Sequence, residues 1–156
     1  MTITAWRIVQ TRHAHTAFTG EGASLYPGRW NQRGTRMVYT AGSLSLAALE
    51  MLVHLEAPAL LHLYVSVPVT FDESICRRID CAGLPPDWAF DPLPPSTQLI
   101  GTTWVQNGDS AVLAVPSVIV RVETNFLLNP AHPDFAHIQI GGASAFRFDP
   151  RLAKTT

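Results

Sequence analysis

Three residues in the first third of the chain have the types and spacing that could do chemistry together. They are Arg29 in the motif GRWN at residues 28–31, Tyr39 in the apolar segment 37–40, and Glu50 in an apolar helical pattern. A cation, an aromatic ring and a carboxylate in such settings are costly to keep near a core unless they have partners or a function. This grouping favours an enzyme that acts on an anionic nucleotide.

Arg29 is a candidate ligand for a phosphate or a carboxylate, because a guanidinium group is a rigid fork of donors that fits either anion. Gly28 leaves space beside it for a ligand or for another backbone segment. The alternative for Arg29 is a structural role, in a salt bridge or stacked on Trp30 or Trp6.

Glu50 lies in a pattern that predicts a helix over residues 43–56, which begins at a serine cap and ends before Pro58. Glu50 and His54 are four residues apart and share a face of this helix. A position facing solvent is the simpler account of Glu50. The polar stripe is nevertheless very narrow, as it is on a helix that lines a ligand site.

Tyr39 ends a strand predicted over residues 36–40, just before the Glu50 helix. If the connecting turn is tight, Tyr39 and Glu50 can lie in one pocket, where the tyrosine could stack on a flat ring or bond to a ribose. The alternative is a core tyrosine with its hydroxyl at the rim.

Ser117 follows a proline inside the apolar segment 111–122, which predicts a buried strand or a pair of strands. We expect either a hydroxyl that positions a ligand or a small core residue bonded to the backbone, because the Gly-x-Ser-x-Gly elbow of a nucleophile is absent. Asn125 begins a segment rich in turn signals, so it is either a ligand-binding amide or a turn residue. His132, Asp134 and His137 do not have a strong metal-ligand spacing, and we predict no metal site.

The remaining pattern predicts short strands, few helices and one long irregular excursion. Strands are expected over residues 6–10, 61–69, 125–129 and 145–149, a short helix or extended segment over 99–107, and a loop over 16–27. Residues 84–97 contain five prolines and form a long loop, in which Trp88 and Phe90 could hold the chain to the body of the protein. These elements predict one α+β domain over residues 1–156, with mixed or antiparallel sheets.

Composition narrows the class of protein further. The chain has 156 residues and a net charge of −1, so a general nucleic-acid-binding surface is not indicated. Neither a signal peptide nor a membrane span is recognisable, which favours a cytoplasmic protein. Cys76 and Cys81 are expected to be free thiols. The phosphate-binding motifs of ATPases and Rossmann domains are absent.

Seven segments, in order, give the chain a resemblance to the RES-domain toxins of bacterial Xre–RES toxin–antitoxin systems. They are WRIV at 6–9, GEGA at 20–23, GRWN at 28–31, VYTA at 38–41, LAALE at 46–50, VPS at 115–117 and NFLLNPAH at 125–132. The family is named for an arginine, a glutamate and a serine, which here look like Arg29, Glu50 and Ser117. Tyr39 and Asn125 would add substrate contacts.

The resemblance implies a toxin that consumes NAD+ by hydrolysis or phosphorolysis and so arrests growth. It implies a fold similar to that of ADP-ribosyltransferase toxins, with NAD+ as substrate, inorganic phosphate as a possible co-substrate, and no cofactor. The implied partner is an inhibitory Xre-type antitoxin that binds DNA, and the toxin would form a homodimer within that complex.

Two other functions remain open from the sequence. One is an ADP-ribosyltransferase that modifies a protein target through the same bond of NAD+. The other is a non-catalytic interaction module that docks a partner through residues 84–97.

Overall fold

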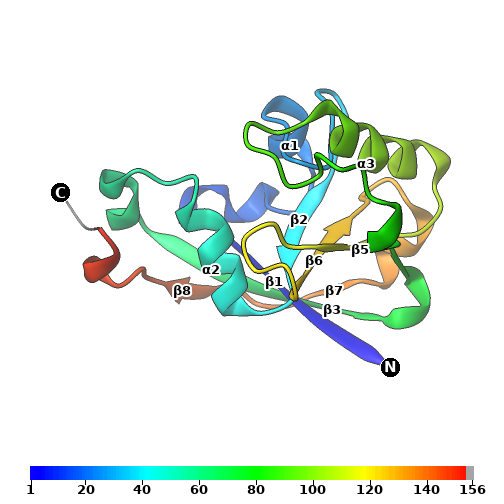
Figure 1. Ribbon diagram of the computed structural model, residues 1–156. Coiled ribbons are helices and arrows are strands. Elements are labelled where there is room, and N and C mark those ends of the chain that lie inside the picture. The colour runs from blue at the N-terminus through cyan, green and yellow to red at the C-terminus, as the bar shows by residue number, and fades with distance from the viewer. Residues whose placement is uncertain (154–156) are drawn as a thin grey trace.

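The computed structural model describes residues 1–153 and is built on one eight-stranded mixed sheet (Figure 1). The strand order is β4-β5-β6-β2-β1-β3-β7, and β8 also pairs with β3. Every pairing is antiparallel except that of β4 with β5. The strands are β1 Thr2–Gln10, β2 Val38–Ala41, β3 Tyr64–Asp72, β4 Cys76–Arg78, β5 Val112–Pro116, β6 Thr124–Leu128, β7 Gln139–Ile140 and β8 Ser144–Phe146. The predicted α+β class with few helices is confirmed.

The sheet has a narrow join between β1 and β2. These two strands are in register at one residue pair, Trp6 with Ala41, whereas β1 pairs with β3 along its whole length. The sheet therefore has two parts, one made of β1, β3, β7 and β8 and the other of β2, β4, β5 and β6. We call them the β1 part and the β2 part.

Helices cover the two parts differently (Figure 1). Helix α2, Leu44–Leu52, packs on β1 and β2 beside the join. Helices α1, Glu21–Leu25, and α3, Pro95–Asn107, lie over the β2 part. Helix α3 is capped at its C-terminal end by Gly108, whose φ of 62° is the left-handed conformation that glycine adopts without steric cost.

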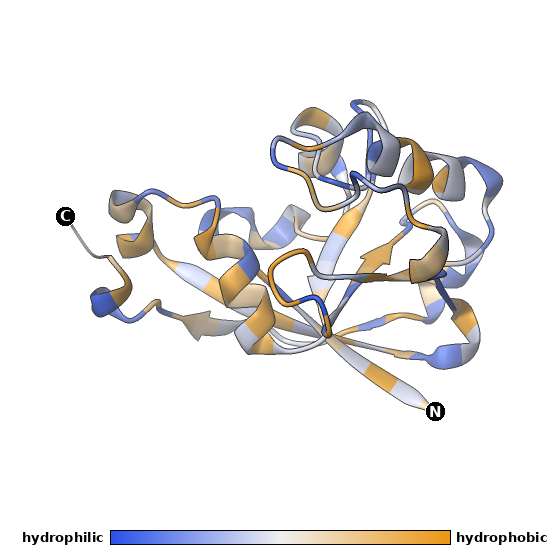
Figure 2. Cartoon of the chain, in the orientation of Figure 1, coloured by the Kyte–Doolittle hydropathy of each residue, from blue (hydrophilic) through white to orange (hydrophobic). Residues whose placement is uncertain are grey.

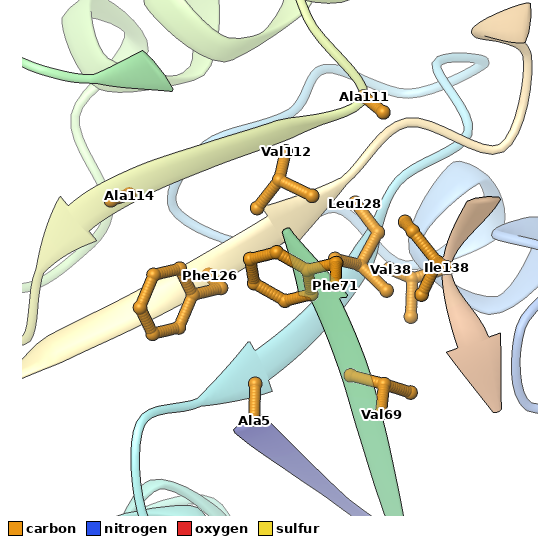
Figure 3. Packing of buried hydrophobic residues seen from close by; sticks show 10 residues of the cluster. All are labelled: Ala5, Val38, Val69, Phe71, Ala111, Val112, Ala114, Phe126, Leu128 and Ile138. Carbon is orange, nitrogen blue, oxygen red and sulfur yellow. The ribbon is translucent and has the colours of Figure 1, made fainter. Parts of the chain in front are cut away.

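Alternation along the strands fills both faces of the β2 part with apolar side chains. The cluster on one face holds an edge-to-face pair, Phe71 and Phe126, with ring centroids 5.6 Å apart (Figure 3). The other face packs against α3 and the segment between α1 and β2, through Trp30, Met37, Trp104, Leu113, Val115 and Leu127. Figure 2 shows that the loop after β5, although outside the sheet, is also strongly apolar.

Several predicted elements have different limits in the structure. The N-cap role of Ser43 is confirmed, since its Oγ accepts a hydrogen bond of 3.1 Å from the Leu46 backbone N–H. The helix ends at Leu52, however, rather than running to residue 56. The strand predicted over 61–69 begins at Tyr64, because the preceding residues form a 3-10 turn, Ala57–Leu61, in which Leu61 is 74% exposed.

The apolar segment 111–122 is one short strand followed by a loop, and not a strand throughout. Strand β5 stops at Pro116, and Val122 is 94% exposed. The predicted loops also contain helix: α1 lies within 16–27, and α3 begins at Pro95, inside 84–97. Trp88 packs against the core as predicted, but Phe90 is 63% exposed.

Strands β4 and β7 were not predicted, and each has three residues or fewer. The last predicted strand, 145–149, is β8, which stops at Phe146. Both cysteines are free thiols, as expected. Within residues 1–153, none of the helices has the length and apolar character needed to cross a membrane.

Candidate active site

The centre of the candidate site is the carboxylate of Glu50, in the last half of α2. Its Oε1 atom accepts two hydrogen bonds, one of 2.8 Å from the Ser117 hydroxyl and one of 2.7 Å from the Asn125 side-chain amide. Ser117 directly follows β5, and Asn125 lies on β6. The fold thus brings together three of the predicted site residues, which are 67 and 75 residues apart from Glu50 in the chain.

Ser117 is fixed as a hydrogen-bonding hub. It is fully buried, and its Oγ accepts 3.1 Å hydrogen bonds from the backbone N–H groups of Ile119 and Val120. A hydroxyl has one proton and two lone pairs, so with both acceptor positions used its proton goes to Glu50. This geometry suits a residue that orients Glu50 and does not suit a nucleophile.

Two oxygen atoms of this cluster are left for a ligand. In residues 1–153, no group donates a hydrogen bond to Glu50 Oε2. This atom is not buried, so it is accessible to solvent. The Asn125 Oδ1 atom is buried and has no hydrogen-bond partner. Buried polar atoms are nearly always paired, so an orphan acceptor beside an oriented carboxylate is a typical mark of a ligand site.

Arg29 lies on the loop between α1 and β2. Its Nη1 donates 2.9 Å hydrogen bonds to the backbone carbonyls of Trp88 and Phe90. Burial lowers the pKa of Arg29, while the negative charges of Asp91 and Glu50 oppose that shift. Arg29 and Glu50 are therefore within electrostatic reach of one another. The structural alternatives, a salt bridge or stacking on Trp30 or Trp6, do not occur among the described residues.

Tyr39 holds the Arg29 loop in place through its hydroxyl. That hydroxyl donates to Asn31 Oδ1 at 2.6 Å and accepts from the Trp30 backbone N–H at 3.0 Å. Burial raises the pKa of Tyr39 well above its usual value, so the phenol stays neutral. Because the single hydroxyl proton is already used, Tyr39 can offer a ligand its half-buried ring more readily than a hydrogen bond. A side chain at Gly28 would begin 2.8 Å from this hydroxyl, which explains the glycine there.

Asn31 is a site-building residue that the sequence reasoning did not single out, although it stands in the motif GRWN. It is fully buried, and its Oδ1 also accepts a 2.9 Å hydrogen bond from the Gly28 backbone N–H. Its Nδ2 donates to the backbone carbonyls of Ala23, Gln32 and Thr35. The only feature of the sequence that could have indicated this role is an amide side chain next to Trp30.

Arg7, on β1, contacts the backbone of Tyr39 and was not singled out from the sequence. Its Nη1 donates a 3.0 Å hydrogen bond to the Tyr39 carbonyl, at the place where β1 and β2 separate. Its Nε atom is buried without a partner, and burial lowers the pKa of Arg7 to about 10, so the group is still charged at neutral pH. A signal was present, because Arg7 has the only charged side chain in the first eleven residues.

A shallow pocket lies next to these residues but is not made by them. It is lined by Arg78, Ile79, Cys81, residues 114–116 and residues 121–124. The pocket adjoins Ser117 and Asn125 along the chain, yet none of the five predicted site residues lines it. We therefore place the candidate site at the hydrogen bonds of Glu50 and not in this pocket.

The histidines near the C-terminal end of the described chain do not form a metal centre. His132 Nδ1 accepts a 3.0 Å hydrogen bond from the Asp134 backbone N–H and so caps a 3-10 turn, Pro133–His137. No group of three potential ligands that could hold a metal ion occurs in residues 1–153.

Comparisons with known proteins identify the family of the chain. The family model described as RES domain matches residues 4–149. The Toxin Res of Yersinia enterocolitica is 38% identical over 148 residues, covering 94% of this chain and 97% of the relative. The Prs ADP-ribosylating toxin of a Sphingobium species is 37% identical over 160 residues, covering 99% of each chain. The chain therefore belongs to the RES domain family.

A solved structure shows the same fold. The M. tuberculosis MbcT-MbcA toxin-antitoxin complex contains a chain that aligns with 98% of this one and over 87% of its own length, with a TM-score of 0.74. The sequences are 17% identical, so this likeness concerns the fold alone.

Proposed function

We propose that the chain is the toxin of a toxin–antitoxin system and that it depletes NAD+ by cleaving the nicotinamide–ribose N-glycosidic bond. The observation that carries this proposal is the Glu50 carboxylate, held through one oxygen by Ser117 and Asn125, with its second oxygen accessible and a guanidinium within electrostatic reach. That arrangement suits a substrate that develops positive charge next to an anionic group.

NAD+ has both features. Breaking its glycosidic bond builds positive charge on the ribose, as in an oxocarbenium ion, and Glu50 would stabilise that charge or hold a ribose hydroxyl. The diphosphate would bind Arg29, with Arg7 as a second cation, because guanidinium groups pair well with phosphate oxygens. The nicotinamide leaving group is already cationic, so the reaction does not require a strong general acid.

The other substrate contacts follow from the atoms that the fold leaves free. Asn125 Oδ1 would accept a hydrogen bond from a ribose hydroxyl or from the carboxamide. The Tyr39 ring would stack on the flat nicotinamide. The acceptor of the ADP-ribosyl group would be water, giving hydrolysis, or inorganic phosphate, giving phosphorolysis. No cofactor enters this scheme.

Names among the relatives support the biological role. Three similar proteins bear the name Toxin Res, and a protein with the same fold was crystallised in a toxin-antitoxin complex. We infer an antitoxin partner of the Xre type, a homodimeric toxin within that complex, and action in the cytoplasm.

A second candidate function has its own support. The Sphingobium relative is called a Prs ADP-ribosylating toxin, and it aligns over nearly the whole chain. The same Glu50 geometry would serve transfer of ADP-ribose to a protein, because the bond that breaks is the same. The two functions differ in the acceptor and therefore in the product.

The test is incubation of the purified, antitoxin-free protein with NAD+, with and without inorganic phosphate, followed by mass spectrometry of the products. Free ADP-ribose indicates hydrolysis, its phosphorylated form indicates phosphorolysis, and a labelled protein in a lysate indicates transfer. Glu50→Gln keeps the shape of the side chain and should lower the rate by on the order of 100-fold. Glu56→Gln, an exposed neighbour just beyond α2, is the matched control.

An NAD+ pool that stays unchanged under all of these conditions would contradict the proposed function. Growth arrest that persists in cells expressing a folded Glu50→Gln protein would point instead to a non-catalytic interaction module.

A further inference from the structure

Two loops hold the two charged groups of the candidate site. The guanidinium of Arg29 is fixed by the carbonyls of Trp88 and Phe90, which belong to the irregular segment 84–94 before α3. The carboxylate of Glu50 is fixed in part by Ser117, the first residue of the loop 117–123 between β5 and β6. The spacing of the two charges therefore depends on how these two loops lie relative to one another.

The side chains of Arg121 and Trp88 bring the two loops into contact. The Arg121 guanidinium carbon lies 5.6 Å from the centre of the Trp88 ring, which is the distance of a cation–π contact. Trp88 also packs against the apolar cluster under α3, so its ring has a fixed position. Arg121 is exposed and has no salt bridge or side-chain hydrogen bond among residues 1–153. The stacking on Trp88 is thus the contact that orders this arginine.

The same residues connect onward to the site in both directions. From Trp88 the path is one hydrogen bond, which Arg29 Nη1 donates to the Trp88 backbone carbonyl. From Arg121 the path is the short loop backbone, in which the N–H groups of Ile119 and Val120 both donate to Ser117 Oγ. Ser117 Oγ in turn donates to Glu50. Each link is a hydrogen bond or a covalent step in the described chain.

We propose that Arg121 and Trp88 are positioning residues, which join the loop that holds Arg29 to the loop that holds Glu50 and so set the spacing of the two charges around the substrate. This inference rests on the proposed function in so far as NAD+ is the substrate. Neither side chain needs to touch NAD+, so neither is a catalytic residue. The substitution Arg121→Gln frees the loop 117–123 without removing any hydrogen bond of Ser117.

The test combines steady-state kinetics with amide hydrogen exchange on the full chain. An exposed cation–π contact is modest, so Arg121→Gln should raise KM for NAD+ by about threefold to fivefold, with a smaller fall in kcat. Arg121→Lys, which keeps the cation, should restore most of the loss. Arg77→Gln changes an exposed arginine on β4 outside these loops, and it should match the wild type.

Hydrogen exchange gives a readout that does not need NAD+. In Arg121→Gln the amides of residues 88–90 and 118–120 should both exchange faster, and Trp88→Leu should speed up exchange in the same two segments. The double variant should be no worse than the more affected single variant, because both changes break one contact.

Independent exchange of the two segments, or kinetics of Arg121→Gln equal to those of Arg77→Gln, would overturn the inference. A wild-type protein that consumes no NAD+ while the two segments still exchange together would contradict the proposed function and leave the coupling of the loops standing. The failure of one proposal is therefore distinguishable from the failure of the other.

Discussion

At Glu50 the important feature is that its two carboxylate oxygens have different surroundings. One oxygen is bound by donors from the ends of two neighbouring strands, whereas the other remains accessible. The sequence identified Glu50 from its narrow polar stripe, but its hydrogen-bond donors lie far along the chain. Local periodicity and composition cannot predict that Ser117 and Asn125 would bind Glu50, because this pairing depends on the register of the sheet.

For Ser117 we predict a loss of both activity and stability on substitution by alanine. Ser117→Ala removes a donor to Glu50 and leaves two backbone N–H groups without their acceptor. Leaving buried groups unpaired costs about 1–3 kcal/mol, and the rate of NAD+ cleavage should fall by roughly tenfold or more. Urea denaturation and NAD+ consumption measure the two effects, with the exposed Ser45→Ala on α2 as control. Full activity in Ser117→Ala would contradict the orienting role.

For Arg7 we predict a separation of stability from activity. A charged group buried without an acidic partner is destabilising, so Arg7→Met should leave the free energy of unfolding unchanged or raise it by up to about 2 kcal/mol. NAD+ consumption should fall in the same variant, because a cation for the diphosphate is lost. A destabilised but fully active Arg7→Met would refute both statements.

The pH dependence of Arg7 gives an independent check. Burial lowers the pKa of Arg7 in the folded chain to about 10, below the value in the unfolded chain. Above pH 10 the folded chain binds fewer protons than the unfolded one, so this contribution to stability rises with pH. The stability difference between wild type and Arg7→Met should therefore shrink as the pH rises through 10. A difference that stays constant across this range would show that the charge of Arg7 has no role in stability.

At the scale of elements, α3 and the Arg29 loop are packed with no space between them. A side chain at Gly101, in the middle of α3, would collide with the Trp30 backbone carbonyl. We expect Gly101→Ala to displace this loop, with a loss of about 1–3 kcal/mol in stability and a higher KM for NAD+. Gly22→Ala in α1 meets no atom within 4 Å and should be neutral or stabilising by about 0.5–1 kcal/mol. Thermal unfolding of the two variants tests this expectation: an unchanged Tm in Gly101→Ala would contradict it.

The sequence predicted element types better than their ends. The cap at Ser43 and the helix after it follow from local chemistry, and so do most of the strands. The helix end at Leu52 and the loop after Pro116 do not, because apolar residues continue past both points. In each case the chain turns for reasons of tertiary packing, and exposed residues such as Val122 carry no mark that distinguishes them from core valines.

At the scale of the whole molecule, the candidate site draws on both parts of the sheet. Glu50 lies on α2, which packs beside the β1–β2 join, while Arg29, Ser117 and Asn125 belong to the β2 part. A ligand in the site should therefore fasten the two parts together. In Glu50→Gln, which we expect to bind NAD+ and to consume it about 100-fold more slowly, saturating NAD+ should slow amide exchange in β1 as well as β6.

The size of this effect follows from mass action. At a concentration of 100 times its dissociation constant, NAD+ should add about 2.7 kcal/mol to the free energy of unfolding. The accompanying rise in Tm is measurable by differential scanning fluorimetry, with adenosine as a ligand that lacks the diphosphate. Protection confined to the β2 part would show that the ligand does not span the join.

The late position of β6 in the chain has a consequence for synthesis. Asn125 and the loop residues Ile119 and Val120, which order Ser117, are added to the growing chain well after Glu50. Until then the Glu50 carboxylate has no complete set of donors to orient it, so the growing chain carries Arg29 and Glu50 without an assembled site.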